Sequence, residues 1–140
     1  MDFCGHSYAQ LDDKNRVRIP GQYKDLLGEE PYIVIGPNQS LYIYTEQEYE
    51  AFRREIGDAT TEKDAAAIRL LNMYTYRIHY DNQGRYLVPQ VLLDYASIDK
   101  EVVFVGNKSK VEMWSKEHFE AYLAQIKPDI NALYSFVGRL

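Results

Sequence analysis

The chain carries the same short segment twice, and this internal repeat constrains its fold more than any single motif. Residues 12–20 read DDKNRVRIP and residues 81–89 read DNQGRYLVP, so an Asp, an Arg and a Pro recur at one spacing. Each copy of a repeat forms one supersecondary unit, because neighbouring copies complete each other's buried surface. Two guanidinium groups are therefore expected in equivalent positions, which suits a regularly spaced polyanion better than a single reaction centre.

The repeat continues into the apolar parts of the chain. After a one-residue slip near Gly28, residues 32–36 align with 102–106 and residues 41–45 align with 111–115. We therefore expect each copy to supply a strand, a short helix, a hairpin and a helix. The expected boundaries are 1–58 for the first repeat, 59–73 for a bridging helix, 74–127 for the second repeat and 128–140 for a C-terminal helix.

Local patterns predict the individual elements. Apolar runs at 32–35 and 41–44, separated by Gly, Pro and Asn, predict a hairpin. Thr45, with a Glu three residues later, is typical of a helix N-terminus, and Ser115 is expected to cap the matching helix of the second copy. Residues 74–80 alternate with period two, which predicts a half-buried strand. A weaker pattern around residues 3–10 predicts a short opening strand.

Apolar stripes are expected on the helices of the second copy. Spacing of three and four residues predicts which side chains share one helix face. The inner stripe of the helix after Ser115 is predicted to consist of Phe119, Tyr122, Leu123 and Ile126. A last short helix is predicted to begin at Pro128 and to carry Ile130, Leu133 and Val137.

The repeated turn has a defined chemistry. The carboxylates of Asp12 and Asp81 can accept backbone N–H bonds from their own turns. Asn15 and Gly84 occupy the same aligned position, and these are the two residue types that best tolerate the left-handed region. The sequence therefore predicts one specific turn, made twice.

Side chains around the two turns suit nucleic acid. Arginine offers a planar fork of donors to phosphate or to guanine, and glutamine can pair with an adenine edge. For either copy alone, an Asp–Arg pair that only stabilises the turn is the alternative. The candidate DNA-binding residues are Lys14, Arg16, Arg18, Gln83 and Arg85, and the candidate turn-forming residues are Asp12, Asn15, Asp81 and Gly84.

Residues 11–20 and 80–89 resemble the paired Asp-x-x-x-Arg signatures of the MraZ family, bacterial transcriptional regulators with two SpoVT/AbrB-type domains. Residues 99–106 and 112–116 resemble the second half of that family. The resemblance implies a mainly β fold with short helices, arranged as a pseudo-two-fold swapped-hairpin (double-split) β-barrel of AbrB/MraZ type. The chain departs from the usual family pattern at Asn15, where Gly is common.

The resemblance also implies a function. It implies a cytoplasmic, nucleoid-associated, ring-shaped homo-oligomer whose partner is double-stranded DNA, at short repeats upstream of the division and cell-wall gene cluster. One alternative is an oligomeric protein-interaction ring without DNA binding, which the net charge of −5 favours. The other is an antitoxin-like AbrB-fold regulator, which the short C-terminal segment opposes.

Composition and motifs argue against other classes. We expect no enzyme, cofactor or small-molecule substrate, because no nucleophile motif, Walker loop or dinucleotide glycine pattern occurs. We expect no metal site, because Cys4 and His6 alone cannot supply four ligands. No apolar run approaches the roughly 18 residues of a membrane span, and the N-terminus lacks the features of a signal peptide. A single Cys is typical of a reducing compartment such as the cytoplasm.

Overall fold

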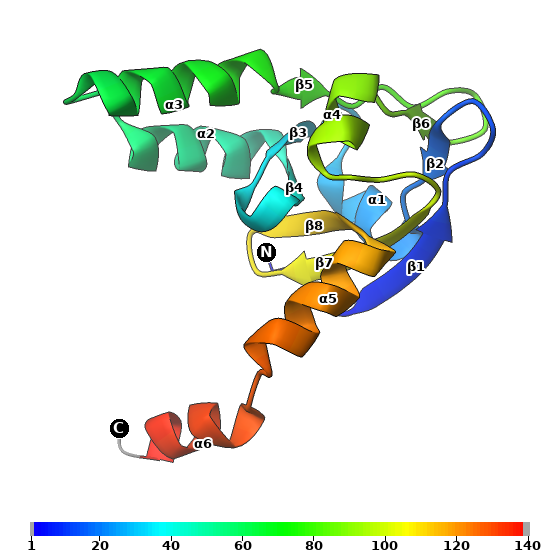
Figure 1. The fold of residues 1–140 in the computed structure, drawn as a ribbon. Helices are drawn as coiled ribbons and strands as arrows, with labels where there is room; N and C mark the ends of the chain where they lie inside the picture. The colour runs from blue at the N-terminus through cyan, green and yellow to red at the C-terminus, as the bar shows by residue number, and fades with distance from the viewer. Residues whose placement is uncertain (1, 139–140) are drawn as a thin grey trace.

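One antiparallel sheet and several short helices make up the chain in a computed structural model that describes residues 2–138 (Figure 1). The six-stranded sheet has the order β1-β7-β8-β4-β3-β5, and β2 pairs with β6 in a separate two-stranded ribbon. The fold is therefore mixed β and helix. Over residues 2–138 the strand pairing does not close the sheet into a barrel. The strands are β1 (His6–Gln10), β2 (Arg16–Arg18), β3 (Tyr32–Ile35), β4 (Leu41–Tyr44), β5 (Tyr76–Arg77), β6 (Arg85–Leu87), β7 (Glu101–Asn107) and β8 (Lys110–Ser115).

The described residues also form six α-helices and one 3₁₀ turn. The helix predicted after each Pro of the repeat is present, as α1 and α4. The helices are α1 (Gly21–Leu27), α2 (Glu46–Ile56), α3 (Glu62–Met73), α4 (Gln90–Tyr95), α5 (Lys116–Ile126) and α6 (Ile130–Gly138), with the 3₁₀ turn at Pro37–Gln39. In the part of the chain that the structure describes, no helix is long and apolar enough to cross a membrane.

The register of two strand pairs is symmetric with respect to the repeat. In the ribbon, Val17 lies opposite Tyr86, which is the residue that the repeat aligns with it. In the sheet, Tyr42 of β4 lies opposite Glu112 of β8, again its aligned partner. Two antiparallel strands whose equivalent residues face each other are related by a local two-fold axis. The two copies therefore interlock through these pairs.

The predicted alignment of residues 32–36 with 102–106 is wrong by one residue. Tyr32 lies opposite Tyr44 in the first hairpin, whereas Val103 lies opposite Trp114 in the second. A one-residue shift moves every side chain of a strand to the other face. The cause is the loop, because the 3₁₀ turn of the first hairpin is replaced in the second by the two residues between β7 and β8. Phe104, rather than Val103, therefore shares its position with Ile33.

The hairpin strands and the start of α2 are confirmed, but two strands are shorter than predicted. Of the predicted strand at 74–80, only Tyr76–Arg77 is a regular strand, and Tyr80 makes one isolated bridge to Tyr86. The ladder ends after the Ile78 N–H donates to the Pro31 carbonyl at 2.8 Å, because proline has no N–H to continue it. The weak opening strand, expected around 3–10, begins at His6, after Gly5 with a φ of 79°. In residues 74–80 the alternation of aromatic residues indicated a half-buried segment, but it did not indicate how many residues would pair.

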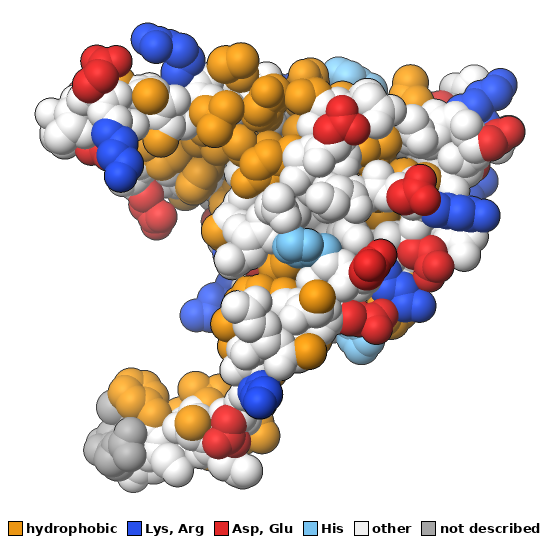
Figure 2. Space-filling model, in the orientation of Figure 1, with side chains coloured by type: hydrophobic (Ala, Val, Ile, Leu, Met, Phe, Trp, Pro, Cys, Tyr) orange, Lys and Arg blue, Asp and Glu red, His pale blue; other side chains and the backbone are white. Residues whose placement is uncertain are grey.

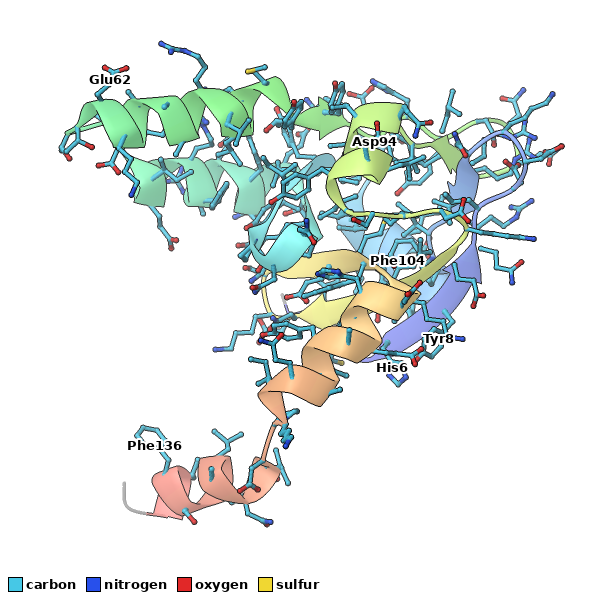
Figure 3. The ribbon with its side chains drawn as sticks, in the orientation of Figure 1. His6, Tyr8, Glu62, Asp94, Phe104 and Phe136 are labelled. Carbon is cyan, nitrogen blue, oxygen red and sulfur yellow. The ribbon has the colours of Figure 1, made fainter. Side chains whose placement is uncertain are left out.

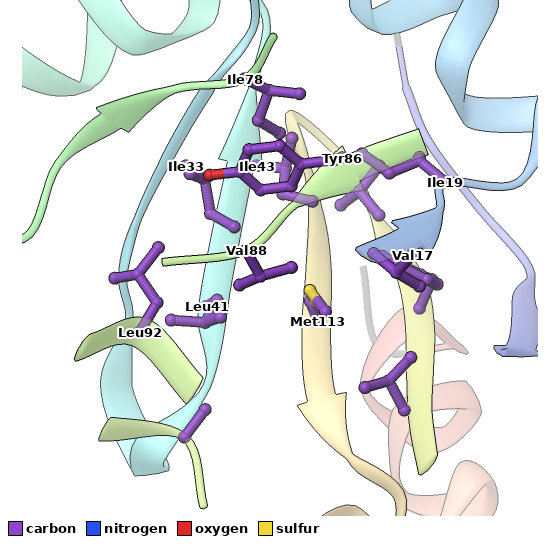
Figure 4. Close-up of a cluster of buried hydrophobic side chains, with 14 of the residues drawn as sticks. Val17, Ile19, Ile33, Leu41, Ile43, Ile78, Tyr86, Val88, Leu92 and Met113 are labelled. Carbon is purple, nitrogen blue, oxygen red and sulfur yellow. The ribbon is translucent and has the colours of Figure 1, made fainter. Parts of the chain in front are cut away.

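The core lies between the sheet and the ribbon. Ile33, Ile43 and Met113 project from the sheet towards Val17 and Tyr86 of the ribbon (Figure 4). Side chains from the short helices complete this layer; those buried in it are Tyr23 and Leu27 of α1 and Leu92 and Leu93 of α4. The ribbon, which carries both repeated turns, therefore packs on the main hydrophobic core.

Gly106 allows the N-terminal segment to approach β7. A Cβ atom at this position would lie 2.4 Å from the backbone nitrogen of Cys4, and the Gly106 N–H donates to the Gly5 carbonyl at 2.8 Å. We expect Gly106→Ala to lower the free energy of unfolding by about 1–3 kcal/mol, since the backbone must shift to admit the methyl group. Urea unfolding measures this cost. Gly21→Ala, whose Cβ would meet nothing within 4 Å, is the control; equal stability of the two variants would contradict the close approach.

The helix caps are confirmed, whereas the inner stripe of α5 is only partly correct. The Glu48 N–H donates to Thr45 Oγ1 at 3.0 Å, and the His118 N–H donates to Ser115 Oγ at 3.2 Å. Two members of the predicted stripe, Phe119 and Tyr122, pack on the Trp114 ring with centroids 5.2 and 5.1 Å away. The other two, Leu123 and Ile126, are 38% and 56% exposed. That prediction is wrong because, within residues 2–138, nothing covers that part of α5.

Candidate functional site

The two repeated turns lie side by side at one edge of the molecule. They precede β2 and β6, and the antiparallel pairing of these strands brings them together (Figure 1). The Val88 N–H donates to the Asn15 carbonyl at 3.0 Å, which ties the end of the second segment to the first turn. Both turns therefore present their side chains on the same side of the structure.

Each turn is closed by its own aspartate. In both copies the Oδ1 atom, of Asp12 or of Asp81, accepts 2.9 Å hydrogen bonds from the backbone N–H groups two and four residues later. The aligned positions Asn15 and Gly84 have φ angles of 61° and 76°. A carboxylate that accepts two backbone donors next to a left-handed residue fixes a compact turn.

The guanidinium groups of Arg16 and Arg85 are held by these carboxylates. The Arg16 Nε donates to Asp12 Oδ2 at 2.8 Å, and the Arg85 Nε donates to Asp81 Oδ2 at 2.9 Å. A further ion pair crosses between the turns, with Arg85 Nη1 3.7 Å from Asp12 Oδ2. The two side chains remain 27% and 22% exposed, so they are neither sealed from solvent nor extended into it.

Part of each guanidinium remains available to a ligand. Arginine carries five N–H donors in a planar fork, and the bond to the turn aspartate uses the one on Nε. Within residues 2–138 the terminal nitrogens of Arg16 make no hydrogen bond. The carboxylate thus orients the fork, and the terminal donors can meet an anion or a base edge without first losing rotamer entropy.

Two cations of the first copy lie on the second turn. Arg18 donates through Nη1 to the Gln83 carbonyl, and the Lys24 ammonium lies 4.8 Å from the centroid of the Tyr80 ring. A Cβ on Gly84 would be 3.6 Å from Lys24 Nζ. Lys24 is not among the residues predicted from the sequence to bind DNA. Its place in a basic stretch was the only indication, because local sequence does not show that β2 pairs with β6.

The second turn is consequently more basic than the first. The repeat aligns Arg18 with Leu87 and Lys24 with Leu93, so the first turn receives no matching cations from the second copy. Lys14 and Gln83 are exposed within their turns. All nine candidate residues thus lie in or against the two turns, and Lys24 is a tenth residue at the same place.

Acidification is expected to loosen both turns. The Arg16 N–H, supported by the Arg16 side chain against a smaller effect of burial, lowers the pKa of Asp12 from 3.8 to about 2. The Arg85 N–H acts in the same way to lower the pKa of Asp81. A lowered carboxyl pKa contributes stability that is complete above the ordinary value and is lost as the pH falls through the folded value. The free energy of unfolding should therefore fall between about pH 4 and about pH 2.

Urea unfolding across this pH range measures the effect, with Asp12→Asn and Asp81→Asn together as the comparison. The double variant lacks both titrating groups, so we expect it to be less stable than the parent at pH 7 and less dependent on acid. Parallel acid dependence of the two proteins would show that the turn carboxylates do not contribute.

Other parts of the surface differ in character from the turns. A cavity of about 600 Å³ between α1 and the start of α2 is lined by Leu26, Leu27 and several carboxylates, a poor match for a polyanion. Among the described residues, no cluster of three or more His, Cys, Asp or Glu side chains is placed to hold a metal ion. The two turns are the strongest candidate for a functional surface.

Comparison with known proteins identifies relatives over nearly the whole chain. A family model described as "MraZ protein, putative antitoxin-like" matches residues 3–72 and again residues 71–132. A "Transcriptional regulator MraZ" from Clostridium tetani is 36% identical over 86% of this chain and 86% of its own length. Proteins of the same name from Clostridium acetobutylicum and Dictyoglomus thermophilum are 33% and 32% identical, each over 99% of this chain and over 98% and 97% of their own lengths.

Proposed function

The chain belongs to the MraZ family, and on that basis we propose that it is a sequence-specific DNA-binding transcriptional regulator. Its proposed target is its own division and cell-wall gene cluster, bound at short upstream repeats through the two Asp-x-x-x-Arg turns. The relatives carry the name of transcriptional regulators, which supports this class of function and gives no reason to expect catalysis.

The observation that carries the proposal is the pairing of β2 with β6, which places two aspartate-closed turns at one edge. Duplex DNA offers repeated phosphates with base edges between them. Contacts to phosphate position a protein on DNA, and contacts to base edges specify the sequence. In the proposed complex, Lys14, Arg18 and Lys24 contact phosphates, while Arg16, Arg85 and the Gln83 amide reach base edges.

The symmetric registers support the finer architecture that the family resemblance implies. In a double-split barrel, each repeat contributes a hairpin to a body shared by both copies. Here β2 pairs with β6 and β4 pairs with β8 across copies, as such an exchange requires. We propose that the sheet and the ribbon are the two parts of this pseudo-two-fold unit.

Assembly would compensate for a small contact. Each phosphate neutralised contributes a slope of about 0.9 to the dependence of log affinity on log salt, so a few contacts give weak, salt-sensitive binding. Several copies bound to successive repeats act at high effective concentration, which raises avidity by about 10² or more. The proposed biological unit is therefore a ring-shaped homo-oligomer associated with the nucleoid in the cytoplasm.

The net charge of −5 is compatible with this orientation. Carboxylates are frequent on α2 and α3, for example in the first turn of each helix. These helices project from the end of the molecule opposite the turns (Figure 1). Repulsion of the phosphate backbone by α2 and α3 would then favour the turn edge as the docking surface.

A salt series tests the proposal directly. The full-length chain is titrated with a duplex from upstream of its own gene and with a shuffled duplex of equal length, from about 50 to 200 mM salt. We expect preference for the upstream duplex and a fall of affinity with salt. If neither duplex is bound at low salt, a protein-interaction ring without DNA binding is the better account.

A further inference from the structure

The last two helices of the first repeat, α2 and α3, pack against each other, whereas α5 and α6, at the end of the second repeat, do not. In the first repeat, α2 and α3 run side by side and antiparallel (Figure 1), and Arg53 donates to Asn72 across them at 2.6 Å. The repeat aligns α5 with α2, and a further helix follows each of them. In the second repeat this further helix, α6, projects away from the body instead of folding back onto α5 (Figure 1).

The projecting helix carries an uncovered apolar stripe. Ile130, Leu133, Tyr134 and Val137 have the spacing of one helix face and are 62%, 54%, 70% and 52% exposed. Phe136, beside the stripe, also points into solvent (Figure 3). An exposed apolar surface of this kind on a small domain marks an interaction site.

A second apolar surface lies at the tip of the α2–α3 pair. A groove of about 450 Å³ there has an apolar lining, in which Ala67 is exposed and the isoleucine and leucine side chains are half-buried. Its ionisable lining residues, Asp58 and Asp64, are both acidic. The groove is lined by Ile56, Asp58, Asp64, Ala67, Ile68 and Leu71.

The two surfaces are complementary but occupy different corners of the molecule (Figures 1 and 2). The helix α6 offers an apolar ridge, and in the sequence Lys127 and Asp129 precede it and Arg139 follows it, which leaves one net positive charge beside the ridge. The groove offers apolar walls and a carboxylate rim. The groove lies where two helices of the first repeat pack together, and a third helix with an apolar face can pack against both of them.

We propose that α6 of one copy docks into the α2–α3 groove of a second copy of this chain. Because the two surfaces differ, the contact is heterologous, and repetition of it builds either a closed ring or an open filament. This contact would hold together the homo-oligomer that is part of the proposed function, so the inference rests on that part of the proposal. It does not involve the turns, so it can be tested without DNA.

The test is the mass of the full-length chain in solution, by size-exclusion chromatography with light scattering. Leu133→Glu disables the ridge, and Ala67→Glu, at an exposed helical position, blocks the groove. Their matched controls are Ser135→Glu, on the opposite face of α6, and Ala66→Glu, next to the groove residue. We expect the parent and both controls to be oligomers, and Leu133→Glu and Ala67→Glu each to have the 16.4 kDa mass of one chain.

Mixing the two single-chain variants gives the decisive result. Leu133→Glu keeps an intact groove and Ala67→Glu keeps an intact ridge, so an equal mixture should form a species of two chains and nothing larger. A monomeric parent, unchanged mass in either variant, or a mixture that stays monomeric would overturn the proposal. Circular dichroism checks that each variant is folded. Binding of monomeric Leu133→Glu to a duplex with one repeat separates a failure here from a failure of the DNA-binding proposal.

Discussion

Replacing Arg16 and Arg85 together with alanine is expected to reduce affinity for the upstream duplex by about 30-fold or more. A bidentate contact between arginine and guanine contributes about 1–3 kcal/mol of discrimination, and the two turns present one such fork each. The salt dependence should change little, because the proposed phosphate contacts of Lys14, Arg18 and Lys24 are retained. Fluorescence anisotropy with upstream and shuffled duplexes, over a salt series, measures both effects.

Loss of the turn and loss of the contact must be separated, because each arginine also donates to its own aspartate. Arg16→Lys with Arg85→Lys keeps the charge but removes the planar fork. We expect this variant to bind the shuffled duplex nearly as well as the parent does and to lose its preference for the upstream one. If the alanine variant binds like the parent across the salt series, the arginines serve only to stabilise the turns.

Leu92→Ala is expected to cost about 2–5 kcal/mol of stability, which is a large part of the 5–15 kcal/mol typical of a domain. Leu92 of α4 is 0% exposed and belongs to the main hydrophobic core, where it lies next to Leu41 (Figure 4). Its loss leaves a cavity in the core on which the ribbon packs, so DNA binding should fail at a lower temperature than in the parent. Urea unfolding and thermal melting monitored by circular dichroism measure the change.

The matched control is Leu87→Ala, at the end of β6, where the leucine is 61% exposed. A surface substitution of this kind changes stability by only about 0.5 kcal/mol or less. Similar costs for the two leucines would contradict the placement of the core between sheet and ribbon.

Local chemistry made much of the fold predictable. The hairpin at 32–44 and the caps at Thr45 and Ser115 depend on residues a few positions apart, and the structure has them where expected. The repeat indicated which residues are equivalent. The predicted alignment of β3 with β7 was wrong by one residue, because a change in loop length shifts the register of a strand and the apolar pattern does not reveal the shift.

What depends on distant partners could not be predicted. Periodicity showed that α5 and α6 have apolar stripes, but it cannot show whether another segment covers them, and Leu123 and Ile126 are exposed. The approach of Arg18 and Lys24 to the second turn requires the pairing of strands about 70 residues apart in sequence. The repeat indicated two symmetric turns; the structure shows them side by side with different numbers of cations.

Site-specific photo-crosslinking tests the central claim most directly, namely that both turns contact DNA together. A photoreactive residue is placed at Lys14 in one variant and at Gln83 in another, with Glu62, at the far end of α3 (Figure 3), as the control. Each variant is irradiated with the upstream duplex. Crosslinks are expected from both turns, at neighbouring nucleotides, and none from position 62. Crosslinks from position 62 alone, or from neither turn while the duplex is bound, would contradict it.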